Sequence, residues 1–473
     1  MESHRQNNRG ANAMAKEEAE DRLSALPDDL LLCILRDVPL KYAVRTSVLS
    51  RRWPRLWLRA LATSPVLDFS DRDFARRQPP AQAVATVRRC LRRHAKRGAP
   101  LDAFRVAFRS PAGGFRWDVV SWVAAALARG AKEVAVDLTP TRWRKAVDDN
   151  WGLMNVDDSA FLELPANLFK SPNSLARLAL VRCSLRAIPF GAPGLTGLRS
   201  LSLSHADVSG EAVRDILLKT CPSLEFLSLR SCNDLFHARI FGDKLRGLEL
   251  VRCLTTLDAW IITPALESFV FHGDVTYSGP GGDSFLLYCR VTPALREAYL
   301  SLIGFVYADP EYYDSHCFAY YRMLISVAHA TILTICSVGL QVTEFLLDLQ
   351  LSGGKASCAM PVLSGEDEDA AYIASKSDHL VLDHLKFIKV VNFRGTRCEV
   401  RLLEILVSRA PALEQLVLVS VEGQGVPSDG QMKIVQDRVM AMRTASPVFR
   451  VVVCRPSEDG SPNPTHTRFY HEE

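Results

Sequence analysis

One arrangement of leucines recurs through the middle of the chain and restricts the possible folds more than any other feature. In its complete form, L-x-x-L-x-L-x-x-C, leucines at alternate positions are followed by a cysteine. Three complete copies begin at Leu175, Leu224 and Leu245. Neighbouring residues of a strand point to opposite faces, so each copy predicts a short strand that buries its leucines on one face.

Two further copies begin at Leu198 and Leu266 and carry Ala206 and Asp274 in the final position. The first leucines of the five copies are 23, 26, 21 and 21 residues apart. This period is typical of leucine-rich repeats, in which a single repeat cannot bury its apolar face alone. The sequence therefore predicts an α/β fold in which irregular repeats stack into a curved solenoid.

Weaker copies extend the array at both ends. Toward the C-terminal end they include Leu295, Leu333, Leu385 and Leu413. Alternating residues around Phe104 and Val134 predict two earlier strands, which fit irregular first repeats. We therefore expect a repeat domain over residues 81–350 and further repeats over residues 380–454.

Two other segments lack the pattern of a folded repeat. Residues 352–378 are rich in Gly and Ser and contain the acidic run 366–369, which predicts a mobile acidic insertion between the repeats. Residues 455–473 have no apolar period, so we expect a disordered tail.

The cysteines indicate structural roles in a reducing compartment. The chain has 12 cysteines, and none forms a C-x-x-C pair. Zinc sites usually contain such close pairs, so Cys183, Cys232 and Cys253 are expected to bond to the backbone of the turn after each strand rather than to a metal. The first ten residues lack the apolar core of a secretory signal, which predicts a cytoplasmic or nuclear protein.

Residues 323–340 form the stretch that most resembles a membrane span. The stretch has 18 mostly apolar residues, whereas a span needs roughly 20, and no basic flank sets an orientation. A buried helix followed by a buried strand explains the same residues, so we expect no membrane partner.

Residues 22–71 predict a small helical domain that follows a polar, disordered start at residues 1–20. Pro27 suits the first turn of a helix, where a missing N–H costs nothing. Asp28 and Asp29 follow it, and negative charge is favourable at this end of the helix dipole.

Apolar residues at spacings of three and four, among them Leu30 and Ile34, continue this first helix until Pro39. A second helix is expected over residues 42–53. Pro54 is expected to interrupt it and to leave a short, kinked third segment.

The strings LPDDLL at residues 26–31, IL at residues 34–35 and VRTSVLSRRW at residues 44–53 resemble an F-box. The family that the chain resembles is a large plant group of F-box proteins with degenerate leucine-rich repeats. Residues 385–418 are similar to the FBD domain of that family. The resemblance covers most of the chain and implies a small three-helix F-box followed by the repeats.

In that family, the F-box binds a Skp-type adaptor, which joins the receptor to a cullin, while the repeats bind a target protein. The resemblance therefore implies a substrate-recognition subunit of an SCF-type (Skp-cullin-F-box) ubiquitin ligase, without enzymatic activity or cofactor of its own. The positions that match the adaptor-binding residues are Leu26, Pro27, Leu30, Ile34, Leu35, Leu49, Ser50 and Trp53.

The residues by themselves agree with this implication but leave alternatives open. A helical module of about 45 residues buries too little surface to be stable alone, so it needs a partner or the rest of the chain. Its leucines could instead form the core of a small helical domain, because apolar faces are more often core than interface. The second candidate function is therefore a leucine-rich-repeat scaffold that acts outside a ligase.

A predicted helix over residues 81–97 carries a cluster of arginines and one lysine on one side. Residues 1–110 hold 22 Lys or Arg but only 12 Asp or Glu, although the whole chain has a net charge of only +4. Such a cluster could bind phosphate or nucleic acid, but it is more often a solvated helix face, and no aromatic residues interleave with it. Nucleic acid is therefore not an expected partner.

The sequence offers no catalytic site. The strings G-x-S-x-G, G-x-x-x-x-G-K-[ST] and H-E-x-x-H are missing, and the 11 histidines are scattered. We therefore predict no catalytic residue, metal site or cofactor.

Overall fold

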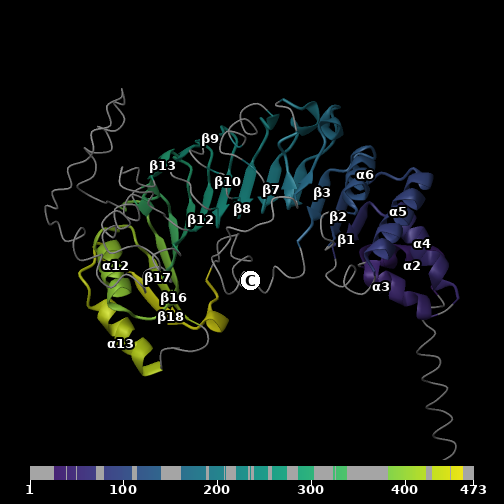
Figure 1. The fold of residues 1–473 in the computed structure, drawn as a ribbon. Helices are drawn as coiled ribbons and strands as arrows, with labels where there is room; N and C mark the ends of the chain where they lie inside the picture. Colours follow the sequence, from purple (N-terminus) through teal and green to yellow (C-terminus); the bar gives the residue numbers. More distant parts are fainter. Residues whose placement is uncertain are drawn as a thin grey trace, which may run out of the picture. The chain divides into compact units, whose positions relative to one another are not determined.

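The structure is a computed structural model of the chain (Figure 1). It describes residues 26–38, 40–49, 51–70, 79–108, 114–139, 161–187, 191–206, 208, 213, 220–232, 235, 239–253, 258–273, 286–302, 323–324, 326–337, 382–421, 429–447 and 449–461. The chain divides into two compact units, of which the first is Met1–Trp143 with Asn173–Leu175 and the second is Arg144–Pro172 with Ala176–Glu473. The start predicted to be disordered (1–20) and the predicted acidic insertion (352–378) lie outside the described residues.

The first unit begins with a helical module, which we define as residues 26–64. Its elements are α2 (Asp28–Asp37), α3 (Leu40–Arg45), the 3-10 turn η1 (Thr46–Val48) and α4 (Trp53–Thr63). The first helix follows Pro27 and carries two aspartates in its first turn, as predicted. The prediction of one continuous second helix over residues 42–53 is wrong, because a 3-10 turn separates α3 from α4.

Pro54 starts a helix rather than interrupting one. It lies in the first turn of α4, which continues for 11 residues. A proline fits there because the N–H groups of the first turn have no partner inside the helix. Within the core of the module, Trp53 and Leu56 of α4 pack with Leu31 and Leu35 of α2.

The rest of the first unit alternates strands with helices. Its elements are β1 (Val66–Phe69), α5 (Pro80–Arg97), β2 (Ala103–Ala107), α6 (Arg116–Leu127) and β3 (Glu133–Asp137). The three strands are parallel, with β1 paired to β2 and β2 paired to β3. The two early strands predicted at Phe104 and Val134 are therefore present. They belong to the same compact unit as the helical module.

A buried histidine connects the helical module to α5. His94 is 0% exposed, and its Nε2 lies 2.8 Å from the backbone oxygen of Ser64, directly after α4. Burial lowers the pKa of His94, so the neutral ring donates its Nε2–H to this carbonyl. On the other side, Nη2 of Arg129 donates to the backbone oxygen of His94 over 3.0 Å. These bonds fix the module to the helix that covers the first parallel strands.

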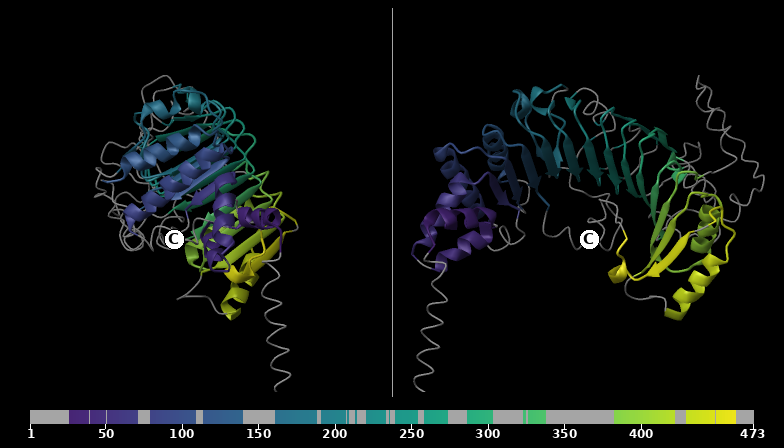
Figure 2. Two further views of the ribbon diagram at one scale, coloured as in Figure 1. Left: turned by 90° about the vertical axis from the view of Figure 1, so that its right-hand side faces the viewer. Right: turned by 180° about the vertical axis from the view of Figure 1, so that it is seen from behind.

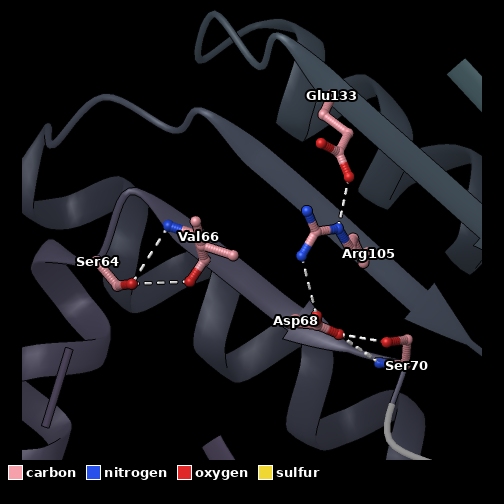
Figure 3. A network of polar contacts seen from close by, with 6 residues as sticks. All are labelled: Ser64, Val66, Asp68, Ser70, Arg105 and Glu133. Carbon is pink, nitrogen blue, oxygen red and sulfur yellow. Dashed lines mark hydrogen bonds and ion pairs between the residues drawn. The ribbon is translucent and has the colours of Figure 1, made fainter. Parts of the chain in front are cut away.

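An arginine crosses the first three strands on their polar face (Figure 3). Arg105 of β2 donates from Nε to Glu133 of β3 over 2.5 Å and from Nη1 to Asp68 of β1 over 3.3 Å. The side chain of Glu133 is only 14% exposed, whereas those of Arg105 and Asp68 are each 38% exposed. The bridge therefore helps to hold the strands in register, although partly exposed ion pairs add little stability.

The second unit contains a long series of parallel strands. In order along the sheet they are β5 (Arg177–Val181), β7 (Ser200–Ser204), β8 (Phe226–Arg230), β10 (Gly247–Val251), β12 (Ser268–Gly273), β14 (Glu297–Leu302), β15 (Ile332–Cys336), β16 (Phe387–Phe393), β17 (Gln415–Ser420) and β18 (Arg450–Cys454). The teal and green strands follow one another in sequence order in the right-hand view of Figure 2. Each predicted repeat copy from Leu175 onward therefore forms a strand, and β18 is an addition that the leucine pattern did not predict.

The leucine ladders explain this order. Leu178 pairs with Leu201, Leu201 with Leu227, and Leu227 with Leu248 across neighbouring strands. The inward leucines of β5, β7, β8 and β10 are between 0% and 2% exposed. Each strand therefore covers the apolar face of its neighbour, as the repeat pattern requires.

Further elements complete the second unit. The shorter strands are β4 (Leu162–Glu163), β6 (Cys183–Ser184), β9 (Arg239–Phe241), β11 (Asp258–Ile262) and β13 (Leu286–Val291). The remaining helices and 3-10 turns are η4 (Ala166–Phe169), η5 (Pro193–Leu195), α12 (Arg397–Ser408), α13 (Asp429–Met440) and η10 (Pro456–Glu458). The strands β9, β11 and β13 form a separate parallel sheet.

A left-handed residue ends several repeat strands. The residues directly after β5, β7, β8 and β10 have φ between 46° and 60°, and they are Arg182, His205, Ser231 and Arg252. This conformation turns the chain out of the strand, although it is unfavourable for residues other than glycine. Cysteine sulfur atoms after the strands bond to backbone oxygens of the strand β8: Cys253 Sγ lies 3.3 Å from the backbone oxygen of Leu229, and Cys232 Sγ lies 3.4 Å from that of Arg230. The predicted structural role of these cysteines is confirmed.

Two expectations about the C-terminal half can now be compared with the structure. Residues 332–336 of the apolar run form the strand β15, and no helix among the described residues is long and apolar enough to cross a membrane. The prediction of a disordered tail is wrong for residues 455–461. These residues include the 3-10 turn η10 and Asp459, and Asp459 pairs with Lys389 of β16. The side chain of Lys389 is 0% exposed and that of Asp459 is 8% exposed.

Candidate functional site

The first helix of the module has one buried and one exposed apolar face. Leu31 and Leu35 are 0% and 4% exposed and belong to the core, whereas Leu30 and Ile34 are 53% and 43% exposed. Residues four apart lie on the same side of a helix, so Leu30 and Ile34 form one apolar stripe. Cys33 is also exposed and lies beside Ile34 on this side of the helix. The stripe has no covering element among the described residues.

The next elements add to the exposed apolar surface. Tyr42 of α3 is 51% exposed, Val48 of η1 is 87% exposed, and Leu49 directly after η1 is 55% exposed. Among the nine large apolar side chains that the described part of the chain exposes, five belong to this one module. We call these five side chains the apolar face, and they are Leu30, Ile34, Tyr42, Val48 and Leu49. Single exposed apolar residues need no explanation, but a group of them indicates an interaction site.

Ion pairs connect the elements that carry the apolar face. Arg52 Nε donates to Asp28 Oδ1 over 2.6 Å, and Arg59 Nη1 lies 3.3 Å from Asp28 Oδ2. The three side chains are between 37% and 51% exposed, so solvent screens these pairs and they contribute little stability. Their contribution is geometric, because they join the start of α2 to the N-cap residue of α4, Arg52, and to Arg59 within α4.

Comparison with known proteins assigns both parts of the chain. A model of the F-box domain matches residues 23–60, and a model described as "FBD-associated F-box protein At5g56370, LRR repeats" matches residues 144–286. The chain is therefore similar to plant F-box/FBD/LRR-repeat proteins in both of these regions. The F-box match covers the whole apolar face.

Three relatives from Arabidopsis thaliana show the extent of the similarity. The FBD-associated F-box protein At5g38590 is 28% identical over 67% of this chain and 67% of its own length. The putative F-box protein At3g29830 is 29% identical over 54% of this chain and 52% of its own length. The F-box/FBD/LRR-repeat protein At3g52680 is 31% identical over 46% of this chain. The chain matches only 41% of the length of that third relative.

The structure divides the eight predicted adaptor-binding positions of the F-box by exposure. Pro27, Leu30, Ile34 and Leu49 are exposed, and Leu26 is half-buried. These five remain candidates for direct contact with an adaptor.

Three predicted positions do not join this exposed set. Leu35 is 4% exposed and Trp53 is 3% exposed, and both pack in the core of the module. In the free chain they form part of the core beneath the exposed residues, and their direct contact with an adaptor stays a prediction. Ser50 lies outside the described residues.

Two members of the apolar face were missed by the sequence prediction. The sequence predicts Tyr42 only as the first residue of the second helix, and it does not place Val48 among the adaptor-binding positions. The segment from Thr46 to Val48 is a 3-10 turn, which points Val48 outward instead. The signal that could have found it is the run of Thr46 and Ser47, because hydroxyl side chains compete with helix continuation. Indeed, Thr46 Oγ1 donates to the backbone oxygen of Ala43 over 2.6 Å.

On the repeat strands, a polar cluster lies on the sheet face opposite the leucines. Ser228 Oγ of β8 donates to Glu249 Oε2 of β10 over 2.5 Å, and Arg230 Nη2 donates to the same oxygen over 3.3 Å. Glu249 is only 1% exposed. A buried carboxylate needs such partners, because an unpaired buried charge is strongly destabilising.

His272 at the end of β12 belongs to the same surroundings. Burial is the largest cause that lowers its pKa from 6.5 to about 3, and the positive charges of Arg252 and Arg230 lower it further. The ring is therefore neutral at physiological pH. Between pH 6.5 and 3 the unfolded chain binds a proton that the folded chain does not, so the free energy of unfolding falls as the pH falls through this window.

Lowering the pH from 7 to 5 is expected to cost about 2 kcal/mol of unfolding free energy through His272 alone. The variant His272→Gln should lose this part of the pH dependence, because it has no proton to bind. Urea unfolding at both pH values measures the difference. His384→Gln, at an exposed histidine, serves as the control. An equal pH dependence in wild type and His272→Gln would show that this histidine is not held neutral.

A groove of about 680 Å³ lies beside the residues at which the chain enters β12, β14, β15 and β16. Its polar lining consists mainly of Glu267, Arg296, His329, Asp383, His384 and Lys386. Lys386 Nζ pairs with Glu414 Oε1 over 3.0 Å, whereas Arg296 has no ion pair with any residue that the structure describes. The groove also has an apolar lining, which includes Pro293, Leu295 and Ala412. A lining with charges of both signs suits a polypeptide segment better than a small apolar ligand.

Proposed function

We propose that the chain is the substrate-recognition subunit of an SCF-type ubiquitin ligase. Its F-box binds a Skp-type adaptor and, through it, a cullin, and its repeats hold a target protein. The observation that supports this proposal most strongly is the coincidence of the F-box match with the apolar face. A module that leaves five large apolar side chains in solvent has a reason to do so when another chain covers them.

The apolar face could provide the centre of such an interface. A standard interface buries about 800 Å² on each partner. Large apolar side chains near the centre of an interface carry most of its binding energy, and polar groups surround them. Leu30, Ile34 and Leu49 would form that centre, with Pro27 and Leu26 at its edge.

The proposed target-binding part is the repeat array, wound as a curved solenoid. Its support is the series of parallel, in-register strands and the groove at their entry. Repeat proteins hold partners on the strand surface or on the loops that border it. Proximity labelling with the proteasome blocked tests this part. Replacing Arg296 by Glu should change the set of labelled proteins, and an unchanged set would exclude the groove.

The chemistry of ubiquitin transfer would belong to the partner enzymes. The chain would contribute proximity, because holding two reactants together removes the entropic cost of their encounter. No group of three or more His, Cys, Asp or Glu side chains in the described ranges could hold a metal ion. Proximity alone requires no reactive group from this chain.

Calorimetric titration of the full chain with a purified Skp-type adaptor tests the proposal against the scaffold alternative. The proposal predicts one adaptor per chain with a dissociation constant near or below about 1 μM, since a standard interface with apolar anchors supports that affinity. Under the scaffold alternative, the intact chain shows no binding heat and does not join a reconstituted cullin complex.

A further inference from the structure

The helix α5 (Pro80–Arg97) has two chemically opposite faces. One face is buried against the strands and the module, and it consists of Ala83, Val84, Val87, Cys90, Leu91 and His94. The other face is exposed and carries six cations, namely Arg88, Arg89, Arg92, Arg93, Lys96 and Arg97. A helix that is apolar on one side must present its polar side to water, so the position of this face is fixed by the core.

Among the residues that the structure describes, only one of the six cations has a neighbouring carboxylate as a partner. Arg88 forms an ion pair with Asp118 of α6. The other five, which we call the cationic face, form no ion pair within the described ranges of the chain, and they are Arg89, Arg92, Arg93, Lys96 and Arg97. A solvated surface usually mixes both signs of charge, because like charges four residues apart on a helix destabilise it.

Helix stability explains only part of the cationic face. Lys96 and Arg97 lie in the last turn of α5, where positive charge is favourable next to the C-terminal end of the helix dipole. Arg89, Arg92 and Arg93 lie one to two turns earlier, and the dipole effect does not reach that far. For these three arginines the fold provides no compensation.

We propose that the cationic face is a docking surface for an acidic segment of a partner protein. Arg89, Arg93 and Arg97 follow one another at four-residue intervals, so they mark points about 6 Å apart along the helix axis. Carboxylates at four-residue intervals on a partner helix have the same spacing. Arginine suits this role better than lysine, because its planar guanidinium binds a carboxylate through two parallel hydrogen bonds.

The geometry favours an acidic polypeptide over a nucleic acid. The row from Arg89 to Arg97 is only about 12 Å long, and the five cations of the cationic face are fewer than the roughly 6–10 phosphate contacts of a strongly salt-dependent DNA-binding protein. Base stacking would also need aromatic side chains, and α5 has no Phe, Tyr or Trp. The surface is separate from the apolar face, so it does not depend on adaptor binding.

The experiment compares two triple charge reversals in the full chain. The first variant is Arg89→Glu, Arg92→Glu and Arg93→Glu, with Arg88 kept because it pairs with Asp118. The matched control is Lys433→Glu, Arg438→Glu and Arg443→Glu, at exposed cations on and just after α13. Both variants change the net charge by the same amount.

The probe is a fluorescently labelled ten-residue polyglutamate peptide, and its binding is measured by fluorescence anisotropy at low salt. We expect the α5 variant to bind the peptide at least about tenfold more weakly than wild type, and the α13 control to bind it almost normally. A neutral variant with Gln at the same three α5 positions should give an intermediate loss and guards against misfolding.

Three results would overturn the proposal. In the first, wild type does not bind the peptide. In the second, both triple variants lose binding equally, which would indicate only a general charge effect. In the third, a single-stranded oligonucleotide of equal charge binds wild type more tightly than the peptide and loses its affinity in the α5 variant. That result would assign the cationic face to nucleic acid.

Discussion

A chain that carries Leu30→Asp and Ile34→Asp is expected to lose at least about two orders of magnitude of affinity for a Skp-type adaptor, because each tenfold loss corresponds to ~1.4 kcal/mol. Both side chains are largely exposed in the free chain, so the substitutions leave the core of the F-box intact. In the complex, the same positions would place two unpaired carboxylates in an apolar interface, which costs several kcal/mol. Calorimetry measures the affinity, and circular dichroism confirms that the helices remain.

The matched control is Ile434→Asp with Met440→Asp on α13. These side chains are 67% and 56% exposed, so the control replaces a similar exposed apolar pair by the same acids. Its affinity for the adaptor should equal that of wild type. Undiminished binding by the Leu30→Asp, Ile34→Asp variant would show that α2 does not contact the adaptor.

The second large effect is expected at the buried ion pair between β16 and the segment after β18. Asp459→Ala should lower the free energy of unfolding of the second unit by about 3–5 kcal/mol, because it leaves a buried ammonium group without its carboxylate. Lys389 is 0% exposed, so water cannot replace the lost partner. Urea unfolding followed by circular dichroism measures the change.

Two controls separate this effect from a general loss of acidic charge. Asp437→Ala removes an exposed carboxylate of α13 and should change the stability by less than about 0.5 kcal/mol. The double variant Lys389→Met, Asp459→Ala should recover most of the loss, because a buried ion pair can be replaced by apolar groups at little cost. A loss below about 1 kcal/mol in Asp459→Ala would mean that Lys389 is hydrated.

The repeat strands were predictable from the sequence because their pattern is local. Leu227 and Leu229 alternate with polar residues, and the same alternation returns in the next repeat, so both the strand and its buried face follow from a few neighbouring residues. The strand β18 (Arg450–Cys454) was missed because it contains valines in succession instead of alternating leucines. A continuous apolar run does not distinguish a strand from a buried helix.

The helical module was predicted less completely. Leu30, Leu31 and Leu32 have the same side chain, yet only Leu30 is exposed, because the choice of face depends on where α4 packs. Similarly, the resemblance to an F-box does not separate the buried Trp53 from the exposed Leu49. Tertiary packing decides these assignments, and local sequence does not contain it.

Contacts between distant segments were beyond sequence reasoning. Lys389 and Asp459 are 70 residues apart, and the residues around each of them do not indicate that the two side chains form a pair. The sequence around Asp459 is polar, which predicted disorder. The structure shows instead that this polar segment supplies the carboxylate that a buried lysine needs.

Alkylation of Cys33 tests the central claim most directly, because it uses the natural chain. Cys33 lies next to Ile34 on the exposed side of α2, and the other cysteines whose side chains the structure describes are buried. Its alkylation rate can be measured by mass spectrometry with and without a saturating Skp-type adaptor. If the adaptor covers the apolar face, the rate should fall by about tenfold or more, since an interface core excludes solvent. A bound adaptor that leaves the alkylation rate of Cys33 unchanged would contradict the account.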